Sequence, residues 1–154
     1  QSTIQHWIRL QIAFSDLNKI ISDTLISDFI KSDAYYIAGY GYKIIGLLYK
    51  VYNEIGFGYQ EKYYARALAL LLKEYNIMFK QELHTPIIFK GKIIGRYYVD
   101  FLIEDKIVVE LKISNEVYDR HFKQVIGYLE SNRIKLGIIA LITPNGIKIK
   151  RIVK

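Results

Sequence analysis

The chain has 154 residues, of which 51% are hydrophobic and 24% are charged, and it contains no cysteine. A chain of this length and composition is typical of a single globular domain with a sizeable core. The absence of cysteine excludes disulfides, thiolate zinc sites and a cysteine nucleophile.

The chain is basic, with 22 lysines and arginines against 15 acidic residues and a formal net charge of +7. Such an excess favours a polyanionic partner such as nucleic acid or an acidic membrane surface, and a basic soluble protein is the equally simple alternative. No apolar run approaches the ~20 residues of a membrane span, and no signal peptide is recognisable. We therefore expect a cytoplasmic protein without a membrane partner, although a chain that begins at Gln1 is compatible with a trimmed leader.

The first third of the sequence predicts helices. From Gln1 to about Lys31, apolar residues recur at helical spacing, and packing or association is the expected role of this segment. The glycines of Gly39-Tyr40-Gly41 predict a break, after which a helix is expected over residues 42–55. Gly56-Phe57-Gly58 is expected to end that helix, since glycine is the usual residue past a helix end.

A further helix is expected over residues 59–75, and it carries an unusual acidic residue. Glu61 lies one turn before Tyr64, on the same face as the apolar core positions of this helix. A carboxylate on a buried face is costly without a partner. A favourable interaction with the N-terminal helix dipole would account for Glu61 equally well.

The rest of the chain predicts strands around one helix. Strands are expected over residues 79–89, 93–103, 107–113, 136–142 and 147–153, with a helix over 116–131 between the third and fourth strands. This order predicts an α+β arrangement around one mixed sheet of about five strands. Pro86 predicts that its strand lies at an edge or contains an irregularity.

The strand that begins at Ile107 carries the most informative pattern. Side chains on a strand point alternately to its two faces, so one face is wholly apolar while Glu110 and Lys112 share the other. Asp100, on the preceding strand, can lie beside that second face. Taken alone, a Glu-x-Lys pair is more often a solvated face than a site.

Together the unusual polar residues suggest a metal site: Glu61, Asp100, Glu110, Lys112 and, on the helix that follows, Gln124. Three carboxylates in one place would repel one another and raise one another's pKa. A divalent cation such as Mg²⁺ or Mn²⁺ removes that repulsion, because hard cations prefer oxygen ligands. A lysine beside the cation can position or deprotonate an attacking water, and the cation can polarise a phosphoryl oxygen.

These residues, in this order, resemble the PD-(D/E)xK nuclease superfamily, whose split motif stands here as Asp100 and then Glu110-Leu111-Lys112. More closely, the chain is similar to the small GxxExxY proteins of that superfamily, through Gly58-Tyr59-Gln60-Glu61-Lys62-Tyr63-Tyr64. The resemblance covers roughly residues 41–153. The chain departs from it where Gly56-Phe57-Gly58 replaces Gly-Pro-Gly and where Tyr52 stands in place of a common histidine.

The resemblance implies a restriction-endonuclease-like core over residues 39–154, preceded by an N-terminal helical extension over residues 1–38. It implies metal ligation by Asp100 and Glu110, with Glu61 as the helix carboxylate and Mg²⁺ or Mn²⁺ as the ion. Lys112 would be the catalytic lysine and Gln124 an auxiliary polar residue. The implied activity is metal-dependent hydrolysis of phosphodiester bonds in DNA.

Two other functions stay open at this point. The first is a non-catalytic nucleic-acid-binding module, and the second is an assembly module that docks a partner protein or forms a homodimer through the N-terminal helices. Phosphate contacts could come from Arg96, Arg120, His121 and Lys123. For these residues a solvated surface, or a structural role in the case of His121, is the more common alternative.

Overall fold

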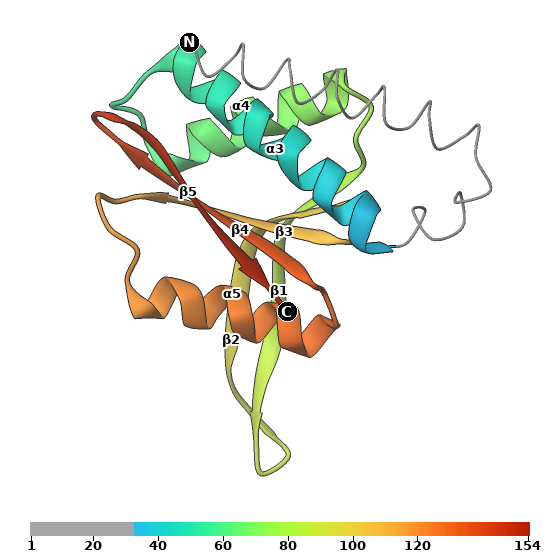
Figure 1. Cartoon of the computed structure of the whole chain (residues 1–154). Helices are drawn as coiled ribbons and strands as arrows, with labels where there is room; N and C mark the ends of the chain where they lie inside the picture. Colours follow the sequence, from blue (N-terminus) through green and yellow to red (C-terminus); the bar gives the residue numbers. More distant parts are fainter. Residues whose placement is uncertain (1–32) are drawn as a thin grey trace, which may run out of the picture.

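The computed structural model describes residues 33–154, and these residues form the expected α+β arrangement (Figure 1). The elements are α3 (Asp33–Ile55), α4 (Glu61–Glu74), β1 (Phe79–Phe89), β2 (Lys92–Ile103), β3 (Ile107–Ile113), α5 (Asp119–Asn132), β4 (Leu136–Thr143) and β5 (Gly146–Val153). The helices expected over residues 1–31 lie outside the described residues, and α3 begins within the predicted extension.

The five strands form one mixed sheet in the order β1-β2-β3-β4-β5. The pair β3 and β4 is parallel, whereas the other neighbours are antiparallel. A parallel pair needs a long crossover connection, and α5 supplies it. Pro86 lies on the edge strand β1, next to a register shift between Ile87 and Ile88, so both features expected of this proline are present.

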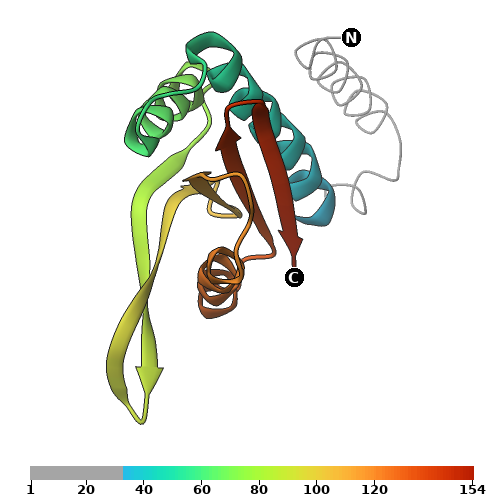
Figure 2. The ribbon, with the colours of Figure 1, turned by 90° about the vertical axis from the view of Figure 1, so that its left-hand side faces the viewer.

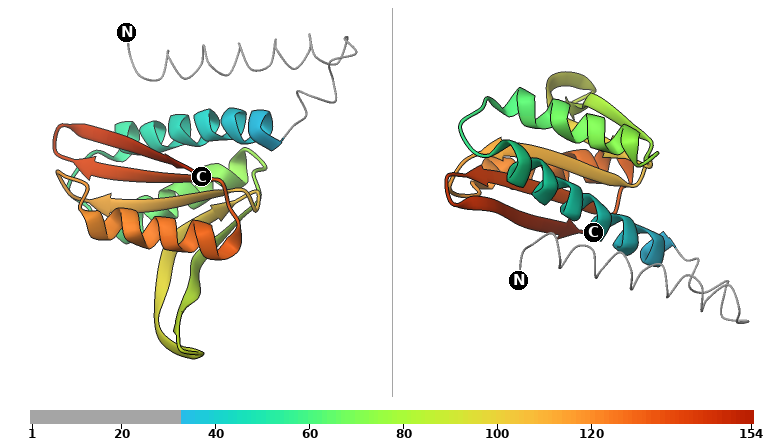
Figure 3. Two further views of the ribbon diagram at one scale, coloured as in Figure 1. Left: turned by 60° about the horizontal axis from the view of Figure 1, so that its bottom comes forward. Right: turned by 90° about the horizontal axis from the view of Figure 1, so that it is seen from above.

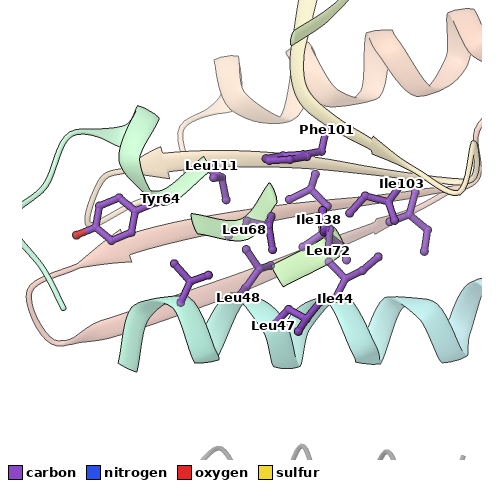
Figure 4. Packing of buried hydrophobic residues seen from close by; sticks show 14 of the residues in the cluster. Ile44, Leu47, Leu48, Tyr64, Leu68, Leu72, Phe101, Ile103, Leu111 and Ile138 are labelled. Atoms are coloured by element: carbon purple, nitrogen blue, oxygen red, sulfur yellow. The ribbon is translucent and has the colours of Figure 1, made fainter. Parts of the chain in front are cut away.

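Helices cover both faces of the sheet (Figure 2). The helices α3 and α4 pack on one face, where Ile44, Leu68 and Leu72 meet Phe101 and Leu111 (Figure 4). The helix α5 packs on the other face through Val125, Tyr128 and Leu129. The strand β3 is buried on both faces, because Ile107, Val109 and Leu111 face the first core and Val108 faces the second.

The predicted break at residues 39–41 is wrong, because α3 continues through both glycines. Glycine inside a helix costs about 1 kcal/mol relative to alanine, and packing outweighs that cost here. Gly39 and Gly41 are buried, and a Cβ on Gly41 would lie 3.1 Å from Leu136 Cδ2. The absence of side chains lets α3 approach β4 closely.

The strands β1 and β2 form a long hairpin that projects away from the rest of the sheet (Figures 2 and 3). They pair with each other from Phe79↔Ile103 to Phe89↔Lys92, whereas β2 pairs with β3 only from Phe101↔Val109 to Ile103↔Ile107. Most of β2 therefore extends beyond the point where β3 leaves it.

Within residues 33–154, no helix has both the length and the apolar character required to cross a bilayer.

Substitution of Gly137, a strand residue that faces α5, tests how tightly this helix packs on the sheet. A Cβ on Gly137 would lie 2.7 Å from Val125 Cγ1, and the β-branched Val125 cannot turn away easily. We expect Gly137→Ala to lower the free energy of unfolding by about 1–3 kcal/mol through overpacking. Gly95→Ala is the control, because its Cβ would make an ordinary 3.5 Å contact with Ile87 Cδ1 and should stabilise by about 0.5 kcal/mol. Urea denaturation measures both changes, and equal effects would contradict the packing described.

Candidate functional site

The site lies where β2 and β3 separate. Their pairing ends at Phe101↔Val109, so Asp100 and Glu110 are the first residues beyond it. Backbone N–H groups of alternate strand residues point to the same edge, and those of Leu111 and Ile113 therefore point toward the side that β2 has left. Asp100 Oδ2 accepts the N–H of Leu111 at 2.7 Å, and Glu61 Oε2 accepts that of Ile113 at 3.1 Å. Side-chain carboxylates thus replace the carbonyls of a neighbouring strand.

Glu61 is the first residue of α4, where the helix dipole favours a carboxylate. The loop before it is held by Tyr64, whose hydroxyl donates to the carbonyl of Gly56 at 2.6 Å and accepts the N–H of Tyr59 at 3.4 Å. Gly58 has φ +118°, a conformation that only glycine adopts without strain. The spacing of Gly58, Glu61 and Tyr64 therefore has a structural explanation: the glycine turns the chain, and the tyrosine fixes the turn that positions the carboxylate.

Glu61, Asp100 and Glu110 each place a carboxylate oxygen within 4.8 Å of the others. Lys112 Nζ lies 3.5 Å from Glu110 Oε1, and Gln124 Nε2 lies 3.3 Å from Glu110 Oε2. The same Gln124 amide also donates to the carbonyl of Tyr98. The structure thus brings together, from α4, β2, β3 and α5, the five residues on which the predicted metal site depends.

Glu110 is the most buried of the three carboxylates, with only 3% of its surface exposed. Burial, together with the charge of Asp100 and a hydrogen bond with it, raises the pKa of Glu110 to about 9. The Lys112 ammonium lowers the pKa but offsets only part of these effects. In the metal-free protein this carboxyl therefore holds a proton at neutral pH.

The three carboxylates fit a divalent cation of the Mg²⁺ type. Oxygen ligands about 2.1 Å from such an ion lie at most about 4.2 Å apart, so a separation within 4.8 Å needs only a small closure. An all-oxygen donor set suits Mg²⁺ or Mn²⁺. A cation here would also supply the positive charge that stabilises the ionised form of the buried Glu110.

A cavity of about 310 Å³ opens beside Lys112, and its lining comprises Lys112, Ile113, Ser114, Arg120, His121 and Gln124. Arg120 is exposed, and its guanidinium lies 4.7 Å from the centre of the Tyr118 ring, which orients it. His121 is buried, and its Nδ1 accepts the N–H of Tyr118 at 3.4 Å. Burial, with the charges of Lys112 and Arg120, holds the pKa of His121 below its usual 6.5.

The structure separates the four residues expected to contact phosphate. Arg120 and His121 line the cavity. Arg96 on β2 and Lys123 on α5 are exposed, and neither belongs to the cavity lining given above. The contributions of Ser114 and of the Tyr98 carbonyl were not predicted. A serine after a strand and a main-chain carbonyl within one carry no sequence signal that separates them from many others.

Residues 38–151 match the PD-(D/E)XK nuclease superfamily, and the chain belongs to this superfamily. Among curated proteins, none matches the chain. A solved structure, the crystal structure of SSO0001, is similar to this chain with 26% sequence identity and a TM-score of 0.48. The similarity covers 60% of this chain and 49% of that one, so the chain spans about half the length of SSO0001.

Removal of one hydroxyl tests whether Tyr64 positions Glu61. Tyr64→Phe leaves the Gly56 carbonyl without its partner, so we expect a loss of about 1–3 kcal/mol of stability. We also expect at least five-fold weaker Mn²⁺ binding by isothermal titration calorimetry, because the Glu61 turn loosens. Tyr52→Phe is the control, since its hydroxyl makes an equivalent 2.6 Å bond to the Thr143 carbonyl. Equal Mn²⁺ affinities in the two variants would contradict the positioning role.

The raised pKa of Glu110 makes the stability of the metal-free protein depend on pH. Between pH 4.5 and about 9 the folded protein holds a proton on Glu110 that the unfolded chain releases, so stability falls as pH rises through this window. The expected slope is about 1 kcal/mol per pH unit between pH 5 and pH 8. Urea denaturation in EDTA should show a flatter profile for Glu110→Gln than for the wild type.

The exposed Glu74 on α4 provides the control for that experiment. Glu74→Gln should keep the wild-type slope. Parallel stability profiles for the wild type and Glu110→Gln would show that Glu110 is not the titrating group.

Proposed function

We propose that this chain is a metal-dependent nuclease of the GxxExxY group, which hydrolyses phosphodiester bonds in DNA. The observation that carries the proposal is the set of three carboxylate oxygens within 4.8 Å of one another, with the Lys112 ammonium beside them. The superfamily match over residues 38–151 supports the reaction class. The Gly58 turn and the Tyr64 bonds support the narrower assignment, because they give the motif of that group a physical role.

In this proposal Glu61, Asp100 and Glu110 hold one Mg²⁺ or Mn²⁺. When bound, the cation polarises a phosphoryl oxygen of the substrate and offsets the negative charge that develops there. Asp100 and Glu61 are held in advance by the backbone of β3, through the bonds from Leu111 and Ile113. Little reorganisation is therefore needed when the ion and substrate arrive.

Lys112 stands at the border between the carboxylates and the cavity, with 25% of its side chain exposed. Its Nζ can hydrogen-bond a water that enters from the cavity and direct the water oxygen at phosphorus. The new bond joins that oxygen to phosphorus, and the bond that breaks joins phosphorus to a sugar oxygen. The attacking water releases a proton to the solvent in the cavity, and the departing sugar oxygen takes up a proton from solvent to become a hydroxyl. The Lys112 charge also stabilises the negative charge on the attacked phosphoryl group.

Gln124 and Arg120 complete the proposed arrangement without taking part in proton transfer. The Gln124 amide bridges the Tyr98 carbonyl and Glu110 Oε2, which fixes the orientation of the buried carboxylate. Arg120, oriented by Tyr118, can contact a phosphate beside the one that is cleaved. DNA as the substrate and a cytoplasmic location are parts of the same proposal.

A non-catalytic binding module is the main rival, and the acidic cluster argues against it. A protein that only binds nucleic acid gains nothing from three carboxylates that repel phosphate and one another. An assembly role of the N-terminal helices stays a prediction, because residues 1–32 lie outside the described part of the chain.

A nuclease assay over a panel of divalent ions tests the proposal. Wild type should cleave plasmid and linear DNA with Mg²⁺ or Mn²⁺ and not in EDTA. Lys112→Ala should lower the rate at least 100-fold while it retains Mn²⁺ binding, and Asp100→Asn should lose both. Lys135→Ala, at an exposed position beyond the C-terminal end of α5, should match the wild type.

Unchanged cleavage by Lys112→Ala would refute the site. Salt-sensitive DNA binding without cleavage under any divalent ion would refute the nuclease and favour the binding module.

A further inference from the structure

The end of the β1–β2 hairpin, residues 86–96, is a projecting segment that we call the arm (Figures 2 and 3). Here β1 and β2 pair only with each other, because β2 pairs with β3 only from Phe101 to Ile103. Large apolar side chains of the arm are 56–64% exposed: Ile88, Phe89, Ile93 and Ile94. Large apolar side chains exposed at the end of a projection indicate a binding surface.

The charge of the arm narrows the choice of partner. The arm carries Lys90, Lys92 and Arg96, and no aspartate or glutamate occurs from Leu83 to Val99. Lys90 Nζ lies 5.5 Å from the centre of the Phe89 ring, so cationic and apolar groups share one surface. Pairing with the same arm of a second copy would bring cations against cations. A nucleic-acid duplex matches both features, since it offers phosphates at the rim of a groove and base edges inside it.

The arm is continuous with the candidate site. The strand β2, which begins in the arm, also carries Asp100, and the carbonyl of its Tyr98 accepts a hydrogen bond from Gln124. A strand rises about 3.3 Å per residue, so Arg96 lies about 13 Å from Asp100 and Ile94 about 20 Å along the strand. At 3.4 Å per base pair, 20 Å corresponds to about six base pairs of duplex.

We infer that the arm is a duplex-binding β-ribbon that enters a groove about six base pairs from the bond held at the carboxylates. A two-stranded ribbon fits the major groove. Lys90, Lys92 and Arg96 contact phosphates, and the apolar end lies against base edges. The inference rests on the proposed nuclease function and adds the form of the substrate: a duplex that extends well past the cleaved bond.

The cationic part is tested by binding in EDTA, where no cleavage occurs. The variant Lys90→Gln/Lys92→Gln/Arg96→Gln should bind a fluorescent 20-base-pair duplex at least ten-fold more weakly than wild type. Its slope of log K against log salt should fall by about 2–3, because each lost phosphate contact removes about one unit. The charge-matched control Lys73→Gln/Lys135→Gln/Lys150→Gln changes exposed lysines outside the arm and should keep the slope. Equal losses in the two variants would overturn the inference.

A second variant and its matched control test the apolar side chains of the arm. Phe89→Ser/Ile94→Ser should weaken duplex binding about ten-fold with an unchanged salt slope, since no charge is removed. Leu70→Ser/Met78→Ser is the control, because both side chains are 67% exposed and lie outside the arm. Thermal melts verify that all four variants are folded. An arm variant that binds the duplex as its control does would contradict the role of the apolar side chains of the arm.

Other occupants of the arm are outcomes of the same experiments. Loss of sedimentation with phosphatidylserine vesicles in the Phe89→Ser/Ile94→Ser variant, with duplex binding intact, would identify a lipid surface and overturn the inference. Loss of a wild-type dimer on analytical ultracentrifugation, again with duplex binding intact, would identify a second copy and overturn it.

Single-turnover cleavage at saturating protein distinguishes a loss of duplex binding from a loss of the cleavage step. Arm variants should reach the wild-type rate, because the carboxylates are untouched. If wild type cleaves and arm variants bind as their controls do, the inference fails and the nuclease stands. If wild type binds the duplex through the arm and never cleaves it, the proposed nuclease function is refuted and the duplex-binding role of the arm is kept.

Discussion

The separation of β2 from β3 at Asp100 is the constraint on which the site depends. Two N–H groups of β3 face a side from which the neighbouring strand has departed, and the N–H of the buried Leu111 would be costly to leave without a partner. Asp100 and Glu61 supply the missing acceptors. The same two carboxylates then lie within reach of Glu110, so one local requirement of the sheet produces an acidic cluster.

Much of the fold follows from local sequence patterns. All five strands and α4 and α5 were predicted to within a few residues, because alternation and glycine or proline punctuation are local signals. The pairing of Glu110 with Lys112 followed from the two-residue period of one strand. The approach of Glu61 and Gln124 depends on tertiary packing, so no local pattern indicated it, and the grouping came from residue chemistry and the family resemblance.

Features that depend on contacts between distant residues were missed. The glycines of α3 predict a break, yet they are the residues that allow close packing against Leu136 on β4. The lengths of β1 and β2 were predicted, but the early departure of β3, which turns their hairpin into a projection, has no local signal. For the same reason the Tyr98 carbonyl, which orients Gln124, was not predicted.

The bonds from Leu111 and Ile113 have a consequence for spectroscopy. Each backbone amide proton of this pair is held by a carboxylate that an ion would also attract, so ion binding must change the electron density at the acceptor oxygen. The two amide resonances in a nitrogen–proton correlation spectrum are therefore built-in reporters. They would shift on ion binding at the cluster itself, and resonances from the far end of the sheet would stay still.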